Sequence, residues 1–452
     1  MGGRTAYYDG TVSPAWVHFE KRFAKGGVAG LISPTISVNE ARQSPLEYPS
    51  LHDNRFIGPL RDAVREIKAA GPGKDGCRYI VQIGDTGGHT HTSLLPQDKD
   101  RVSASPFFDF TYGYPNSARA MSADEIEKTV DDFEQAAHRV VAAECDGVEI
   151  TASKGYLIHQ FLNPLTNRRT DAYGGSVDKR FKLLEDIVKA VRKAVGPEFL
   201  FGVRLSAKDF NNSPVSVRFP LTWPPPPWQA WIGNDLAETI HYARKLEALG
   251  VDYLHVDSGF GFPNPHGSPG DFPHEAVLNT FNAYRFLSGK ARARATMFNL
   301  VSLLPTSVSK KLLGMGWQFR PAANADFAAA IRQAVKIPVI ANGGFQDRDV
   351  IDGALTSNKC DMIAIARPLL ANPDLLDQFD KGANTPENPC SFCSLCCAST
   401  AIFPLGCYDQ KRFKTPEKMM NQILAWCSPN APFSVKDGSR IDEDAQQLEL
   451  LQ

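Results

Sequence analysis

Short apolar runs alternate with longer amphipathic segments along most of the chain, a pattern that predicts repeated βα units. Seven runs read as buried parallel strands: Ala29–Ile36, Tyr79–Gly84, Gly147–Thr151, Leu200–Leu205, Tyr253–Asp257, Pro338–Ala341 and Met362–Ala366. Helical spacing of apolar residues predicts helices at Pro14–Ala24, Asp53–Ala69, Ala123–Ala143, Lys179–Val195, Leu236–Leu249, Ala325–Val335 and Val350–Thr356. Ser122 and Glu125 predict a capping box at the start of the third helix.

The helix at Pro14–Ala24 comes before the first strand, so the βα order implies one more strand upstream of it. Met1–Gly10 is too short and too rich in glycine to supply that strand with its loop. We therefore expect a (β/α)8 TIM barrel whose first strand is truncated. A seven-strand open sheet is the alternative.

Two connections are much longer than α/β units usually have, residues 206–234 and 260–324. The first carries Trp223, the proline run Pro224–Pro227 and two further tryptophans, so it either covers a substrate or is an exposed spacer. The second has its own helical pattern near Ser307–Leu313. We expect residues 1–380 to form the barrel and residues 381–452 to form a cysteine-bearing extension with a partly disordered tail.

The charge balance narrows the classes of partner. With 49 Lys and Arg against 50 Asp and Glu, the net charge is −1, which argues against binding to nucleic acid or to an anionic membrane. No apolar run is long enough to span a membrane, and the start resembles no secretory signal, so a cytoplasmic protein is expected. We expect a small-molecule substrate and allow for a homo-oligomer.

A phosphate site is predicted at the ends of the last two strands. Asn342, Gly343 and Gly344 directly follow a strand, where backbone N–H groups can approach an anion. Arg367 ends the next strand and can pair with that anion through two parallel hydrogen bonds. This is where barrel enzymes usually bind phosphate.

The segment GYLIHQFLNPLTNRRTDAYGGS, at residues 155–176, carries a family resemblance. It resembles the FMN-binding barrel family of the old yellow enzymes and NADH:flavin oxidoreductases, in the branch of 2,4-dienoyl-CoA reductase and trimethylamine dehydrogenase. The similarity in order and spacing runs from about Gly2 to Cys407, and it identifies Met1–Gly3 with the end of the family's first strand.

The resemblance implies roles for single residues. Gln82 and Arg204 match positions that contact the pyrimidine ring of FMN, while Ala366 stands where relatives carry glycine. Thr151 and Lys154 replace the His-x-x-His or His-x-x-Asn pair that holds the substrate carbonyl. A hydroxyl and an ammonium can still donate to an oxygen that gains negative charge. Tyr156 matches the tyrosine that protonates the α-carbon.

Five cysteines gather in one stretch near the C-terminus, and in a reducing compartment such clustering points to metal. The spacing Cys-x-x-Cys-x-x-Cys with a distant fourth cysteine is typical of iron–sulfur proteins, and the iron–sulfur relatives carry a similar set. We expect Cys390, Cys393, Cys396 and Cys407 to hold a [4Fe–4S] cluster. Cys397 is the alternative third ligand, and zinc is the alternative metal.

No dinucleotide-binding G-x-G-x-x-G motif follows a strand, so electrons are expected from NAD(P)H that docks over the flavin, or from a redox partner protein through the cluster. The sequence thus predicts an ene-reductase-type oxidoreductase that reduces an activated C=C bond of an unsaturated carbonyl compound or enoyl thioester. The alternatives are an oxidative amine demethylase or dehydrogenase, a Lys154 Schiff-base lyase and an inactive truncated remnant.

Overall fold

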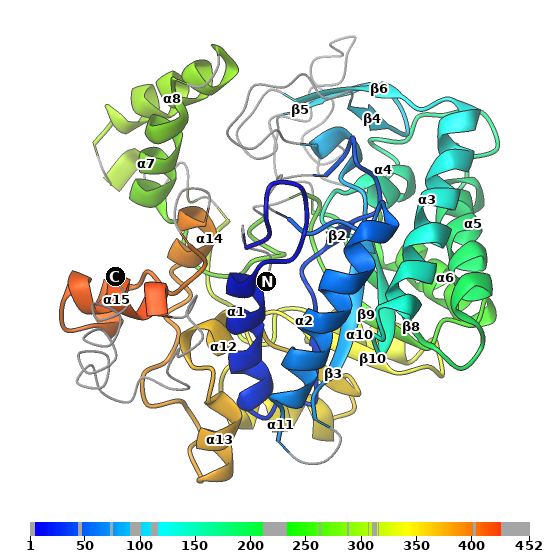
Figure 1. Ribbon diagram of the computed structural model, residues 1–452. Coiled ribbons are helices and arrows are strands. Elements are labelled where there is room, and N and C mark those ends of the chain that lie inside the picture. The colour runs from blue at the N-terminus through cyan, green and yellow to red at the C-terminus, as the bar shows by residue number, and fades with distance from the viewer. Residues whose placement is uncertain are drawn as a thin grey trace.

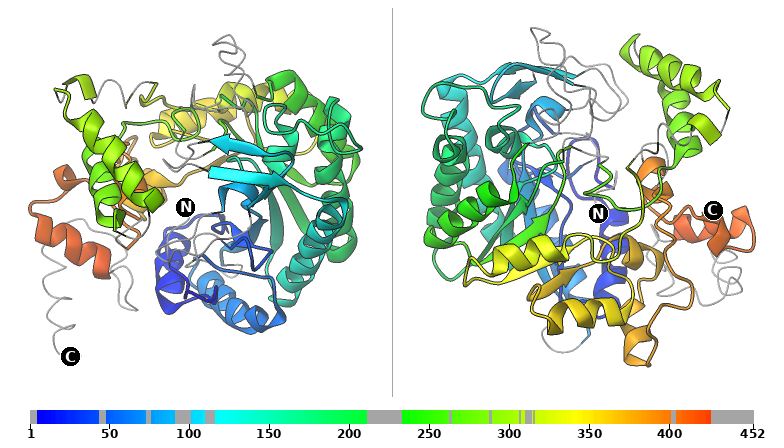
Figure 2. Two further views of the ribbon diagram at one scale, coloured as in Figure 1. Left: turned by 90° about the horizontal axis from the view of Figure 1, so that it is seen from above. Right: turned by 180° about the vertical axis from the view of Figure 1, so that it is seen from behind.

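The computed structural model describes residues 5–43, 48–72, 76–90, 101–109, 116–210, 233–261, 264–286, 289–305, 307–309, 314, 316–400 and 404–425. A curled sheet of parallel strands lies inside a ring of helices (Figures 1 and 2). Its order is β1 (Gly30–Ile32), β3 (Arg78–Gly84), β7 (Gly147–Ala152), β8 (Leu200–Ser206), β9 (Tyr253–Asp257), β10 (Val339–Asn342) and β11 (Met362–Ala364). This sheet confirms the predicted barrel fold.

The first predicted strand is split in two. Its second half is β2 (Ile36–Ser37), which also pairs with β3 in parallel. Between the halves, Ser33 turns its hydroxyl toward the carbonyl of Pro34 at 2.7 Å. The expected strand end at Met1–Gly3 lies outside the described residues, and β1 and β11 end the strand order within the described part of the chain.

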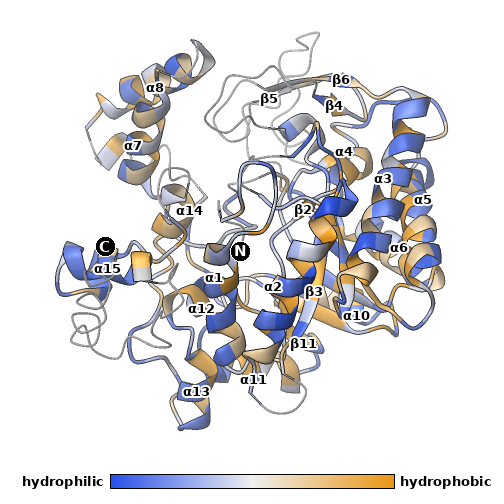
Figure 3. Cartoon of the chain, viewed as in Figure 1, coloured by the Kyte–Doolittle hydropathy of each residue, from blue (hydrophilic) through white to orange (hydrophobic). Residues whose placement is uncertain are grey.

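The outer helices occupy the predicted segments, with ends shifted by a few residues. They are α1 (Pro14–Lys25), α2 (Ile57–Ala69) after the turn η1 (Asn54–Phe56), α3 (Ala123–Ala142), α5 (Val177–Val195), α6 (Leu236–Ala248), α10 (Ala325–Arg332) and α11 (Arg348–Thr356). The predicted capping box is present: Ser122 N–H donates to Glu125 at 2.8 Å, and Glu125 N–H donates to Ser122 Oγ at 3.2 Å. These helices combine polar and apolar faces (Figure 3), and their apolar residues join the strands in one core.

An aspartate stands directly before each of three strands at the N-terminal end of the barrel. Asp146, Asp252 and Asp361 accept the N–H of Tyr79, Phe201 and Val339 in the neighbouring strand, at 2.7, 2.7 and 2.9 Å. Each also pairs with a basic side chain, namely Lys68, Arg192 and Arg332 at 2.7, 2.8 and 2.9 Å. This repeated arrangement fixes the register of neighbouring strands.

Two additions follow strands β3 and β9. A small sheet of β4 (Val102–Ser103), β5 (Phe107–Asp109) and β6 (Asn116–Ala120) comes after β3 and the turn η2 (Gly87–His89). Helices α7 (His274–Tyr284) and α8 (Gly289–Ser302) come after β9 and lie apart from the small sheet (Figure 1). They precede the helix expected near Ser307–Leu313, of which only residues 307–309 are described. The tryptophan and proline stretch lies outside the described residues.

Two short helices follow β11, α12 (Arg367–Ala371) and α13 (Leu375–Asp380). The expected extension after residue 380 contains α14 (Leu395–Ser399), the turn η4 (Gln410–Arg412) and α15 (Pro416–Ala425). Helix α7 lies against α14, where Thr280 Oγ1 donates to the carbonyl of Ala398 at 3.3 Å. None of the described helices is both long and apolar enough to cross a membrane.

Candidate active site

The loop after β7 carries Lys154 in a left-handed backbone conformation. Lys154 has φ 60° and Gly155 has φ 74°, a region that is strained for lysine. Two side chains of helix α4 (Leu157–Leu162) hold the loop: His159 Nδ1 accepts the N–H of Gly155 at 2.9 Å, and Gln160 donates to its carbonyl at 2.7 Å. His159 in turn contacts Asp209 at 2.7 Å, so the loop rests on a buried polar support.

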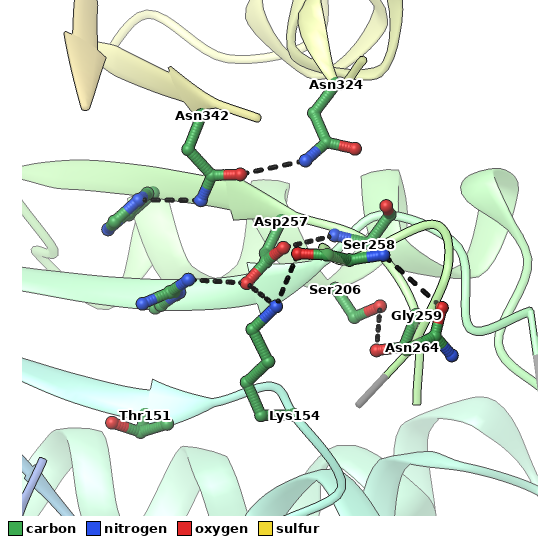
Figure 4. Close-up of polar contacts among 12 residues, drawn as sticks. Thr151, Lys154, Ser206, Asp257, Ser258, Gly259, Asn264, Asn324 and Asn342 are labelled. Atoms are coloured by element: carbon green, nitrogen blue, oxygen red, sulfur yellow. Dashed lines mark hydrogen bonds and ion pairs between the residues drawn. The ribbon is translucent and has the colours of Figure 1, made fainter. Parts of the chain in front are cut away.

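The Lys154 ammonium reaches across the strand ends to Asp257, the last residue of β9 (Figure 4). Its Nζ lies 2.7 Å from Asp257 Oδ2 and donates to the carbonyl of Gly267 at 3.1 Å. Arg204 of β8 donates to the same Oδ2 at 2.5 Å. Two cations therefore share one oxygen of a carboxylate that is only 1% exposed.

The charges in this cluster perturb one another. Burial acts to raise the pKa of Asp257, but Lys154 and Arg204 outweigh it and hold that pKa well below its usual range. Burial lowers the pKa of Lys154, and the carboxylate of Asp257 offsets only part of the shift. The ion pair is thus what opposes loss of the lysine proton.

A second buried network lies on the β3 and β7 side of the barrel. Gln82 Nε2 donates to Glu149 at 2.6 Å, while Gln82 Oε1 accepts the hydroxyl of Thr35 at 2.5 Å. Tyr253 also donates to Glu149, at 3.1 Å. Burial acts to raise the pKa of Glu149, but the nearby His255 and Arg204 lower it overall. Glu149 therefore stays ionised and fixes which end of the Gln82 amide faces Thr35.

The network continues to the predicted phosphate turn. His255 contacts Glu149 through Nδ1 at 3.2 Å and Asn342 through Nε2 at 3.0 Å. Asn324 donates to Asn342 Oδ1 at 2.8 Å, as Figure 4 shows. Gly343 and Gly344 follow with φ 97° and 78°, and a Cβ on Gly344 would lie 2.2 Å from the carbonyl oxygen of Arg320. Only glycine fits that second position.

Arg367, the other half of the predicted phosphate site, begins helix α12. It donates to the carbonyl of Pro269 at 2.6 Å and to Ser394 Oγ at 3.2 Å. Its guanidinium also lies over the Phe392 ring, 5.1 Å from the centroid. In the structure Arg367 thus joins the loop after β9 to the cysteine segment, and Ala366 precedes it as an exposed residue.

The predicted substrate-binding and catalytic residues have different surroundings. The Thr151 hydroxyl lies 3.5 Å from Thr35 Oγ1, next to Gln82, whereas the Lys154 ammonium is turned toward Asp257 (Figure 4). Tyr156 occupies the position directly before α4 and lies near enough to Arg204 for its charge to act on that guanidinium. The structure therefore brings Tyr156, Lys154 and Arg204 to one end of the barrel.

The cysteine segment is clamped to the barrel through Gln346. This side chain accepts the N–H of Cys390 at 2.7 Å and donates to its carbonyl at 3.3 Å. Arg412 donates to Cys407 Sγ at 3.0 Å, and the sulfurs of Cys396 and Cys397 lie 4.0 Å apart. Within the described residues, no three His, Cys, Asp or Glu side chains are placed to bind a single metal ion.

The thiols near the extension influence one another's ionisation. Burial raises the pKa of Cys390 to about 11, and the neighbouring Cys407 and Cys393 add to that rise. Burial likewise raises the pKa of Cys393, with a contribution from Cys407. Cys396 and Cys397 act chiefly on each other: their contact and burial raise the pKa of Cys396, and the same contact lowers the pKa of Cys397 to about 7.

Sequence reasoning missed Asp257, Glu149 and Thr35. Asp257 ends a predicted strand on the face where barrel enzymes place catalytic groups, so its position was a usable signal. Glu149 is a charged residue inside an apolar run, which also indicates a specific buried partner. Thr35 lies within the predicted strand Ala29–Ile36 and gives no comparable signal.

Comparison with known proteins adds a family match. Residues 1–215 and 306–386 match the NADH:flavin oxidoreductase / NADH oxidase family. The chain is 29% identical over 389 residues to a metal reductase of Desulforamulus reducens, covering 86% of this chain and 47% of the relative. It is 27% identical over 380 residues to an NADPH dehydrogenase of Bacillus velezensis, covering 83% of this chain and 87% of the relative.

Among solved structures, 2-naphthoyl-CoA reductase in complex with 2-naphthoyl-CoA superimposes with a TM-score of 0.70 at 20% identity. The match covers 95% of this chain and 55% of the reductase, and at this identity it shows the fold. The chain spans about half the length of the metal reductase and of this reductase. Helices α7 and α8 fall between the two matched ranges of the family.

Proposed function

Since the chain belongs to the NADH:flavin oxidoreductase / NADH oxidase family, we propose that it is an FMN-dependent oxidoreductase of the ene-reductase type. It uses electrons from NAD(P)H to reduce an activated C=C bond in an unsaturated carbonyl compound or enoyl thioester. The observation that carries the proposal is the cluster of Lys154, Arg204 and Asp257 at the C-terminal ends of the strands. Catalytic groups of barrel enzymes lie at this end.

The residues at this end of the barrel fit FMN. Among the described residues, Arg204 Nε and Asn324 Oδ1 are buried polar atoms that have no hydrogen-bond partner. A buried donor or acceptor left unpaired is costly, so a ligand that pairs with it is favoured. Arg204 and Gln82 would hold the pyrimidine edge of the flavin, while Asn342, Gly343 and Gly344 would cradle its phosphate. Arg367 and Ala366 complete the proposed phosphate site.

Bound FMN would be the source of the hydride for the β-carbon of the substrate. Lys154 donates a hydrogen bond to the carbonyl oxygen, where negative charge collects as the hydride arrives. Thr151 is proposed as a second donor on the β7 side. Tyr156 holds the proton that passes to the α-carbon, so hydride and proton together saturate the double bond. A tyrosine proton suits this step because an enolate carbon is strongly basic.

The ion pair with Asp257 weighs against the Schiff-base lyase. An amine attacks a carbonyl only in its neutral form. Burial lowers the pKa of Lys154, but the carboxylate 2.7 Å from its Nζ favours the charged form and offsets part of that shift. An oxidative amine demethylase would bind a cationic substrate, which the Lys154 ammonium would repel. We therefore keep reduction of an unsaturated carbonyl compound as the proposed reaction.

The proposal includes a [4Fe–4S] cluster held by Cys390, Cys393, Cys396 and Cys407. Cys393 and Cys407 lie near enough to Cys390 to raise its pKa, and Cys407 also raises the pKa of Cys393, which supports placing these three thiols around one cluster. A single zinc ion would need its thiolates packed closely around one point, an arrangement that the described residues lack. Arg412, which donates to Cys407, would offset part of the negative charge on the thiolates.

The first experiment is an absorption spectrum of protein purified without oxygen, with iron and flavin assayed on the same sample. We expect flavin bands, a broad shoulder from the cluster and about four irons per chain. The Cys393→Ser variant should lose iron, whereas Cys360→Ser, which alters a buried cysteine of the barrel, should keep it. A folded protein without flavin would contradict the proposed reaction, and a flavoprotein without iron would remove only the cluster.

A further inference from the structure

Asp257 links three separate elements at the catalytic end of the barrel. It ends β9, receives Arg204 from β8 and receives Lys154 from the loop after β7. Its second oxygen, Oδ1, accepts the N–H of Ser258 at 2.8 Å. The carboxylate is thus held by its own backbone while it holds two side chains that come from neighbouring strands.

The charges around this carboxylate do not cancel. Burial and the two cations Arg204 and Arg367 favour the neutral form of Lys154, and only Asp257 stands against them among the main influences on its pKa. Lys154 in turn acts on Cys397 of α14. An arginine keeps its charge under all ordinary conditions, so lysine is the member of the cluster that can give up a proton.

We propose that Asp257 is a positioning residue, whose single carboxylate holds the Lys154 ammonium and the Arg204 guanidinium side by side. Without its charge the two cations repel, and Lys154 loses both its proton and its fixed place at the strand ends. Lys154 donates a charge-assisted hydrogen bond to a substrate oxygen only while it is protonated. Asp257 would therefore act on the reaction through Lys154, without touching the substrate.

The same strand offers a matched control. Asp252 stands directly before β9, pairs with Arg192 at 2.8 Å and accepts the N–H of Phe201 at 2.7 Å. Asp257 likewise pairs with an arginine and accepts one backbone N–H, but it adds Lys154. A purely structural role predicts that Asp252→Asn and Asp257→Asn behave alike, whereas the positioning role predicts that only Asp257→Asn alters Lys154.

The test is the titration of Lys154 in the full chain. Trace labelling with acetic anhydride over a range of pH, followed by mass spectrometry of the peptide that contains Lys154, gives the midpoint at which its amine becomes reactive. We expect Asp257→Asn to shift the midpoint down by at least one pH unit, so that Lys154 is about tenfold more reactive at a pH below both midpoints. Asp252→Asn should leave the midpoint unchanged. An unshifted midpoint in folded Asp257→Asn would overturn the proposal.

The wild-type chain keeps the idea testable if Asp257→Asn does not fold. Lys154 should then titrate above neutral pH in the wild type, and a midpoint below neutrality would overturn the proposal, because Asp257 would not be holding the charge. The labelling requires neither flavin nor turnover. A shifted midpoint in a protein without flavin would sustain the role of Asp257 and refute the proposed function. An unshifted midpoint in a protein that binds flavin would overturn the role of Asp257 and leave the proposed function standing.

Discussion

The two ends of the barrel use charged residues in different ways. At the N-terminal end, Asp146, Asp252 and Asp361 each exchange hydrogen bonds with a neighbouring strand and pair with basic side chains. At the C-terminal end, Asp257 serves two buried cations through one oxygen, and Arg204 Nε has no partner among the described residues. The three aspartates at the N-terminal end are paired within the protein, whereas Arg204 at the C-terminal end still has an N–H group that can bind a ligand.

The largest effect is expected from Gly344→Ala at the C-terminal end. The new Cβ would lie 2.2 Å from the carbonyl oxygen of Arg320, at a backbone φ of 78° that strains alanine. We expect the variant to lose bound FMN and all turnover. Flavin content after gel filtration measures this. Gly353→Ala in α11, where no atom lies within 4 Å of the new Cβ, should keep its flavin.

Lys154→Met should reduce turnover by about 100- to 1000-fold, the usual cost of removing one donor from a developing oxyanion. Steady-state kinetics with an enone and NAD(P)H measure the change, and the flavin spectrum should remain. The wild type should lose activity on the alkaline side as Lys154 deprotonates, at lower pH than an ordinary lysine, because burial lowers its pKa. Turnover of Lys154→Met within threefold of wild type would refute its role as donor.

Tyr156→Phe should slow reduction of the substrate by about 100-fold, at the lower end of the range for general acid catalysis. Reduction of the flavin by NAD(P)H should stay unchanged, because no proton from Tyr156 enters that half-reaction. Stopped-flow measurement of the two half-reactions separates them. Equal slowing of both would assign Tyr156 to binding rather than to proton transfer.

Asp146→Asn tests the N-terminal end and should have the smallest effect on activity. Asp146 accepts the N–H of Tyr79 and pairs with Lys68 and Arg78 at 2.7 and 3.3 Å. Loss of these charge-assisted bonds should lower the free energy of unfolding by about 1–3 kcal/mol. Urea unfolding measures that loss, and kcat per folded molecule should not change. A large loss of kcat would contradict the view that charged residues at the N-terminal end serve stability and not the reaction.

Much of the fold could be predicted because buried parallel strands form apolar runs that stand out in sequence. All seven predicted strands are present, although Ala29–Ile36 is split between β1 and β2. Helices α7 and α8 were not predicted, since basic and apolar residues are mixed along Gly289–Ser302 and give no clear period. Helix α7 packs against α14 of the cysteine segment, and α8 packs against α7, so tertiary contacts set their places.

The candidate site could be predicted only residue by residue. Thr151, Lys154 and Arg204 were identified at strand ends, but the sequence does not say which of them meet. That depends on register: Thr151 lies beside Arg204, and Ser206 lies beside Asp257 in the next strand. The left-handed turn at Lys154 then directs its ammonium to Asp257. Such long-range contacts are invisible to local patterns.

The most direct test of a redox site at the C-terminal end is reoxidation of the reduced protein without oxygen. Protein reduced by a limiting amount of NAD(P)H is mixed with an enone or an enoyl thioester, and the flavin absorbance and the saturated product are followed together. We predict that flavin absorbance returns as one equivalent of product forms, and that Lys154→Met slows both events equally. Flavin that stays reduced with every unsaturated carbonyl compound, or that is reoxidised without forming product, would contradict the account.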